Sequence, residues 1–68
     1  METSARNQLS GSVVAVTMGA VMAEVTVDIG GAQVVAAITK ESAERLGLET
    51  GKAVTAIIKA TDVMIGVS

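Results

Sequence analysis

The chain has 68 residues, half of them hydrophobic, and a formal net charge of −2 at pH 7. It contains no His, Cys, Pro or aromatic residue, so the usual general base, the thiol nucleophile and the rings that stack on nucleic-acid bases are all missing. The acidic balance also removes the cationic field on which sequence-independent nucleic-acid binding depends. An enzyme and a nucleic-acid-binding domain are both disfavoured.

The small size of the chain predicts one domain, residues 1–68, with a marginal core. A chain of this length buries only about 60% of the surface that it exposes when unfolded. Its apolar side chains include none of the large rings that dominate most cores. Because no disulfide or metal cluster can reinforce the core, oligomerisation is the remaining common device. We expect an obligate oligomer, and the alternative is a small monomeric barrel.

Targeting signals are not evident in the sequence. No apolar run approaches the roughly 18 residues that a membrane span requires. The N-terminus lacks the basic region and apolar core of a signal peptide. We therefore expect a cytoplasmic protein that does not interact with a membrane.

The first forty residues have the alternation of β-strands. After a loose end at residues 1–3, strands are predicted over residues 9–18, 21–29 and 33–38. Gly30-Gly31 suits the positive φ angles of the tight turn between the second and third strands. These strands predict a meander. The residues expected to share one face of the first strand are Val14, Val16 and Met18.

A short helix and two further strands complete the predicted fold. Thr39 has the features of an N-cap, and Gly47 suits the position just after the helix end. Strands are predicted over residues 53–59 and 63–67. The expected fold class is mainly β, a small five-stranded OB-like barrel with one short helix between strands 3 and 4. A two-layer sheet with a covering helix is the alternative.

The acidic residues do not predict a catalytic or cation-binding site. Glu24 and Asp28 share a face of one strand, where a solvated surface explains them. Asp62 follows a strand and suits a structural role in a turn. The seven acids are scattered, without the spacing of a calcium loop. We therefore expect a protein that is not an enzyme.

Anion binding is better supplied near the N-terminus. Arg6 offers a planar fork of N–H donors that suits tetrahedral oxyanions. Ser4 adds a hydroxyl, and Asn7 and Gln8 add amide donors. The alternative is that Arg6 pairs with an acid or solvates the start of a strand.

The helix start and one strand end offer further donors. Free backbone N–H groups at positions 40–42, with the positive end of the helix dipole, favour an anion. Thr39 and Ser42 bring hydroxyls to the same turn, and capping alone leaves Ser42 unexplained. Lys59 ends an otherwise apolar strand, where a cation is either exposed or engaged with a ligand.

Two segments, SARNQL at residues 4–9 and IKATDVMI at residues 58–65, carry a close resemblance to the molbindin, or Mop, family. The likeness spans nearly the whole chain, and the apolar strands between these segments are its less specific part. The resemblance implies an OB-like domain of the TOBE type. It further implies a hexamer, assembled as a trimer of dimers, that binds molybdate or tungstate at subunit interfaces.

The resemblance also implies which residues bind the oxyanion. They come from two subunits, so no complete pocket would exist in one chain. Many relatives have Ser in place of Ala60 and Lys in place of Ser10, so this chain lacks one donor and one positive charge. Molybdenum would be bound as its oxyanion, with no bare metal ion and no catalytic cofactor. The implied residues are Ser4, Arg6, Thr39, Ser42, Lys59 and the backbone of Ala60.

The expected function is binding, for storage or buffering, of molybdate or tungstate. Molybdate is a dianion at neutral pH, so a site built only of donors suits it. Hydrogen phosphate carries a proton that needs an acceptor, whereas sulfate has none and must be excluded by size. The alternative is a structural or interaction module of the OB type that assembles without a ligand.

Overall fold

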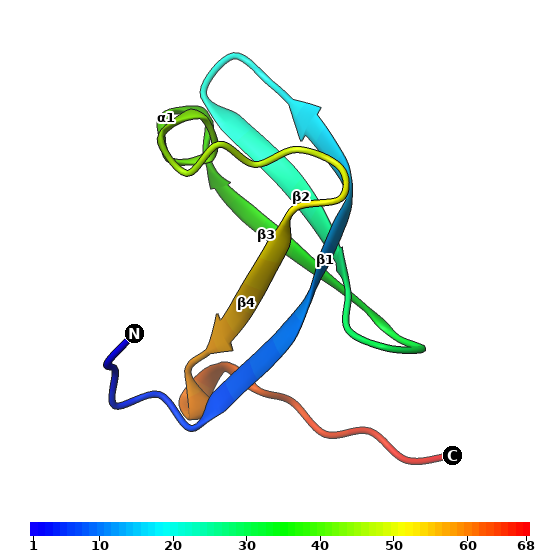
Figure 1. Cartoon of the computed structure of the whole chain (residues 1–68). Helices are drawn as coiled ribbons and strands as arrows, with labels where there is room; N and C mark the ends of the chain where they lie inside the picture. Colours follow the sequence, from blue (N-terminus) through cyan, green and yellow to red (C-terminus); the bar gives the residue numbers. More distant parts are fainter.

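A computed structural model describes all residues, 1–68. Four antiparallel strands form one sheet in the order β3-β2-β1-β4. The sheet curls into an open half-barrel, with its mouth between the edge strands β3 and β4 (Figure 1). The predicted meander, β1 to β3, is confirmed. The elements are β1 (Asn7–Met18), β2 (Met22–Asp28), β3 (Gln33–Thr39), the helix α1 (Lys40–Arg45), β4 (Ala53–Ile58) and a 3-10 helix η1 (Ala60–Asp62).

The predicted fifth strand, over residues 63–67, is absent. After η1 the chain runs away from the sheet (Figure 1), and its last backbone hydrogen bond is donated by Val63 to the carbonyl of Ala60. An extended segment becomes a strand only where a neighbour pairs with its backbone. The order of the other elements confirms the mainly-β, OB-like class with a helix between strands 3 and 4. The closed five-stranded barrel is wrong, because the isolated chain forms a four-stranded half-barrel.

The core lies on the concave face of the sheet. Val13 on β1 pairs with Val27 on β2, and Val25 lies on the same face two residues away. These three side chains form the central cluster. Only five of the 68 residues are buried, so the core is as small as the composition predicts.

Strand β1 contains a β-bulge at Val14. Val13 and Ala15 pair with consecutive residues of β2, which leaves Val14 without a partner. A bulge shifts the alternation of side chains by one residue. Val13 and Val16 therefore face the core, whereas Val14 is 38% exposed and Met18 lies at the open end of the strand. The predicted shared face of Val14 with Val16 is wrong for this reason.

The predicted turns and helix limits are confirmed. Gly30-Gly31 has φ angles of 93° and 98° in the connection between β2 and β3. Thr39 caps α1, and Gly47 follows its end with a φ of 63°. The N–H groups of Gly47 and Leu48 donate to carbonyls of the last helical turn, which is a Schellman motif. The helix is six residues long, and no helix here could cross a membrane.

Gly11 lies where β1 passes close to the backbone at the end of β2. A Cβ atom there would overlap the carbonyl oxygen of Asp28. Because this oxygen belongs to the backbone of a paired strand, it cannot rotate away. We expect Gly11→Ala to lower the free energy of unfolding by about 1–3 kcal/mol, measured by urea titration. Exposed Ser10→Ala, on the same strand, is the control, and equal losses in both variants would contradict this close approach.

Candidate functional site

The N-terminal motif and the end of β4 meet in one pocket. Asn7, at the start of β1, pairs with Ile58, at the end of β4, so the segments flanking these residues lie beside each other. They enclose about 500 Å³, which we call the strand-end pocket. Four of the six predicted site residues line it. The lining is Thr3, Ser4, Ala5, Arg6, Ile57, Lys59, Ala60 and Thr61.

The strand-end pocket supplies hydrogen-bond donors and positive charge. Arg6 and Lys59 are its two charged residues, and no carboxylate lines it. Both are exposed, and neither takes part in any side-chain hydrogen bond of the chain. The alternative in which an acid of the same chain holds Arg6 is therefore not observed. The guanidinium of Arg6 and the ammonium group of Lys59 have no partner within the chain, so both can bind an anion.

Two amide side chains hold the N-terminal segment in place. Asn7 Nδ2 donates to a main-chain carbonyl at the end of β4, at 3.2 Å. Gln8 Nε2 donates to the carbonyl of Ala5, at 2.8 Å. From the sequence, both amides are predicted donors to an anion. In the structure they instead fix the backbone that carries Arg6.

Thr3 also lines the pocket, although residues 1–3 are predicted from the sequence to be a loose end. Thr3 Oγ1 accepts the N–H of Ala5, at 3.2 Å. A Thr side chain commonly accepts the backbone N–H of the residue two positions later. This local preference is the only signal for the position of Thr3 in the sequence. Thr61 brings a further hydroxyl to the pocket, next to Ala60, which has none.

Thr39 and Ser42 lie at the start of α1. Thr39 Oγ1 accepts the N–H of Ser42, at 3.1 Å, and donates its own proton to Ser42 Oγ, at 2.8 Å. The N–H of Lys40 donates to the carbonyl of Val21, at 2.7 Å. The prediction of free N–H groups at positions 40–42 is therefore wrong for Lys40 and Ser42. The Thr39 hydroxyl accepts the N–H of Ser42, and the carbonyl before β2 accepts the N–H of Lys40. Only the N–H of Glu41 remains without a partner.

The pocket beside the helix start has mixed charge. It encloses about 410 Å³, and we call it the helix-start pocket. One cation and two carboxylates line it, so the local charge opposes an anion. Ser42 is half-buried behind this lining. The lining residues are Ala20, Val21, Thr39, Lys40, Glu41 and Glu44.

The two groups of predicted site residues lie at opposite ends of the sheet. The strand-end pocket precedes the start of β1, whereas Thr39 pairs with Met22, next to the other end of β1 (Figure 1). Strand β1 has 12 residues, which gives it a length along the chain of roughly 36 Å. One small oxyanion cannot contact both ends. A single chain therefore brings together Ser4, Arg6, Lys59 and Ala60, and leaves Thr39 and Ser42 apart from them.

Known proteins match the chain over nearly its whole length. It is 54% identical over 66 residues to molybdenum-pterin-binding protein 3 of Clostridium pasteurianum, which covers 96% of this chain and 97% of that protein. A solved structure of a molybdate-binding protein from Sporomusa ovata has a TM-score of 0.90 at 42% identity and covers 96% of this chain and 97% of that one.

A second solved structure, of the cytoplasmic molybdate-binding protein ModG with molybdate bound, has a TM-score of 0.93 at 42% identity. It covers all of this chain, which corresponds to about half of ModG, 49%. The family model of the TOBE domain matches residues 3–65. The chain belongs to the TOBE domain family.

Proposed function

We propose that this protein binds molybdate or tungstate, for storage or buffering, at the subunit interfaces of a homo-oligomer. The strand-end pocket carries the proposal, because it combines two cations and several hydroxyls without a lining carboxylate. Two relatives that are each 42% identical to the chain are described as molybdate-binding proteins. One is the protein from Sporomusa ovata, and the other is ModG. The proposed role is binding rather than catalysis, with no catalytic cofactor.

The proposed site is shared between two subunits. One subunit contributes the strand-end pocket, and another contributes the helix start. The separation of these groups by the length of β1 supports two subunits. The Ser42 hydroxyl accepts a hydrogen bond from the Thr39 hydroxyl, so its own O–H is free to donate to an oxyanion. The proposed residues are Ser4, Arg6, Lys59 and the backbone of Ala60 from one subunit, and Thr39 and Ser42 from the other.

The proposed assembly is a hexamer, built as a trimer of dimers from one domain per chain. A core of five buried residues and an apolar concave face that is partly open to solvent support assembly. Cytoplasmic storage is proposed because ModG is described as cytoplasmic. Ligand at a shared interface would stabilise the oligomer by mass action.

The proposed ligand is the bare oxyanion, although one relative is called a molybdenum-pterin-binding protein. A pterin is a flat ring that needs stacking and several paired donors and acceptors. The chain has no aromatic residue. Its apolar groove has 13 hydrophobic residues among its 14 lining residues, which leaves the polar edge of a pterin unpaired. The strand-end pocket instead suits a compact dianion.

Titration calorimetry with four anions tests the proposal. We expect heat with molybdate and with tungstate, and weaker binding of hydrogen phosphate, whose proton would find no carboxylate in the strand-end pocket to accept it. Sulfate should bind at least about tenfold more weakly, because a larger oxyanion reaches donors on both subunits. No heat with molybdate, or equal affinity for sulfate, would contradict the proposal. Elemental analysis of the purified protein for molybdenum separates this function from the ligand-free module.

A further inference from the structure

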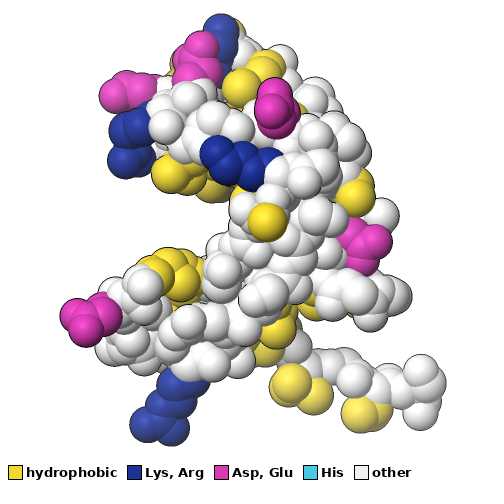
Figure 2. All heavy atoms as spheres, viewed as in Figure 1, with side chains coloured by type: hydrophobic (Ala, Val, Ile, Leu, Met, Phe, Trp, Pro, Cys, Tyr) yellow, Lys and Arg dark blue, Asp and Glu magenta, His cyan; other side chains and the backbone are white.

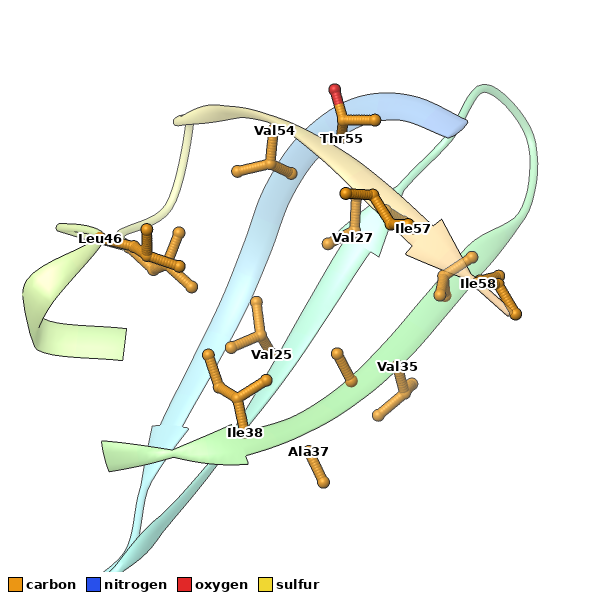
Figure 3. Close-up of a pocket in the computed structure, with 14 residues that line it drawn as sticks. Val25, Val27, Val35, Ala37, Ile38, Leu46, Val54, Thr55, Ile57 and Ile58 are labelled. Carbon is orange, nitrogen blue, oxygen red and sulfur yellow. The ribbon is translucent and has the colours of Figure 1, made fainter. Parts of the chain in front are cut away.

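Charged side chains lie outside the apolar hollow of the half-barrel. In Figure 3, every labelled residue that lines this hollow is apolar except Thr55. Figure 2 shows acidic and basic side chains together over α1, and a basic side chain at the other end, near the start of β1. Both ends of the sheet therefore present charge for contacts between subunits.

The strand-end pocket holds two positive charges without a counter-ion. Arg6 and Lys59 line the same pocket, and no carboxylate of the chain lines it. Two cations that share one pocket repel each other. Water and salt screen this repulsion in an isolated chain, but the screening falls once a second subunit covers the pocket. A bound oxyanion would neutralise the two cations, so the empty site requires another source of negative charge.

The helix start carries the complementary charge. One cation, Lys40, and two carboxylates, Glu41 and Glu44, line the helix-start pocket. Glu41 directly precedes Ser42, and its exposed carboxylate accepts no hydrogen bond within the chain. Opposite charges on two faces that meet favour their contact and fix its register. The carboxylate of Glu41 is therefore available to the cations of another subunit.

We propose that Glu41 of one subunit pairs with Arg6 and Lys59 of another subunit while the site is empty, and that the oxyanion displaces it. The inference rests on the proposed function, because that function brings the strand-end pocket and the helix start of two subunits together. A bound dianion takes the same two cations and repels the carboxylate. Glu41 therefore lowers the affinity for the oxyanion. In return, the site can release its oxyanion without leaving two covered cations unpaired.

Carbodiimide cross-linking of the natural protein without molybdate tests this contact. The reagent joins a carboxylate to an amine through an amide bond and leaves no spacer, so it links only groups that touch. We expect Glu41 of one chain to be joined to Lys59 of another, giving a dimer on a denaturing gel and a linked peptide by mass spectrometry. Within one chain these residues lie at opposite ends of the sheet. Molybdate should suppress the link, because it displaces the carboxylate.

The variant Glu41→Gln measures the effect of the carboxylate on the site, since it removes the charge and keeps the size of the side chain. We expect the molybdate affinity in calorimetry to rise about three- to tenfold, and the rise to shrink in about 0.5 M salt. Damage to α1 would lower the affinity instead, so the sign separates the two effects. The control Glu49→Gln removes the same charge outside both pockets and should leave the affinity unchanged.

Two results would overturn the proposal. One is the absence of a link between Glu41 and Lys59 in the molybdate-free protein, or a link from Glu44 in its place. The other is equal molybdate affinity in Glu41→Gln and the natural chain. A link in a protein that gives no heat with molybdate would contradict only the proposed function. Molybdate binding without the link would contradict only the counter-ion.

Discussion

Arg6→Ala should abolish molybdate binding and leave the oligomer assembled. Arg6 has no hydrogen-bond partner within its own chain, so its removal leaves no internal acceptor unsatisfied. Hydrogen bonds to charged groups contribute about 1.5–3 kcal/mol each. The guanidinium of Arg6 can donate two such bonds to the same oxyanion. We therefore expect the affinity to fall at least about a hundredfold. Calorimetry measures the affinity, and sedimentation measures the assembly.

Two control variants separate the effect of the guanidinium hydrogen bonds of Arg6 from the effect of its positive charge. Arg45→Ala removes the same single charge from the end of α1, away from the strand-end pocket. We expect this variant to bind molybdate with nearly unchanged affinity. Arg6→Lys keeps the charge but loses the planar fork, so its affinity should lie between those of the natural chain and Arg6→Ala. Unchanged affinity in Arg6→Ala would remove Arg6 from the site.

Mixing two defective variants should restore binding. Arg6→Ala damages the strand-end pocket, and Ser42→Glu places a carboxylate at the helix start. The second change keeps the helix stable, because Thr39 with Glu three residues later is a capping box. Each variant alone should show no binding. If the site joins two subunits, co-refolding equal amounts should restore about a quarter of the sites, since half of each kind of half-site is intact.

The number of restored sites is read by calorimetry on the co-refolded mixture. Refolding together is needed so that the two variants share oligomers. Arg6→Ala co-refolded with itself is the control and should bind nothing. If all binding residues belonged to one chain, every chain in the mixture would carry a defect and no site would return. That result would contradict a shared site, whatever the affinity of the natural protein.

Local features of the fold could be predicted because they depend on neighbouring residues. The cap at Thr39 and the turn glycines, Gly30-Gly31 and Gly47, need only their own backbone geometry. The alternation of β2 predicts its buried face for the same reason, because that strand has no irregularity. The bulge at Val14 could not be predicted, since it depends on how β1 pairs with β2. The same pairing explains why Gly11 must lack a side chain.

The candidate site divides in the same way. The sequence was sufficient to identify Arg6 and Lys59 as cations in unusual positions, but not to show that they share a pocket. That proximity arises because Asn7 pairs with Ile58 across the sheet. Likewise, the hydrogen bond that occupies the N–H of Lys40 comes from Val21, a residue distant in the sequence. Whether a donor is free is a property of the folded chain.

By itself, the sequence determined the chemistry that this protein has available: no histidine, no thiol, no stacking ring, and a few charged groups and hydroxyls. Side-chain alternation and capping also predicted β1 to β4 and α1, whereas the strand predicted over residues 63–67 is absent. Only the tertiary structure decided which donors meet, and that four strands leave the barrel open while the C-terminal residues 63–67 stay exposed. The physical reason is that pairing between strands joins residues far apart in the sequence, and a strand without a partner in its own chain has no defined place.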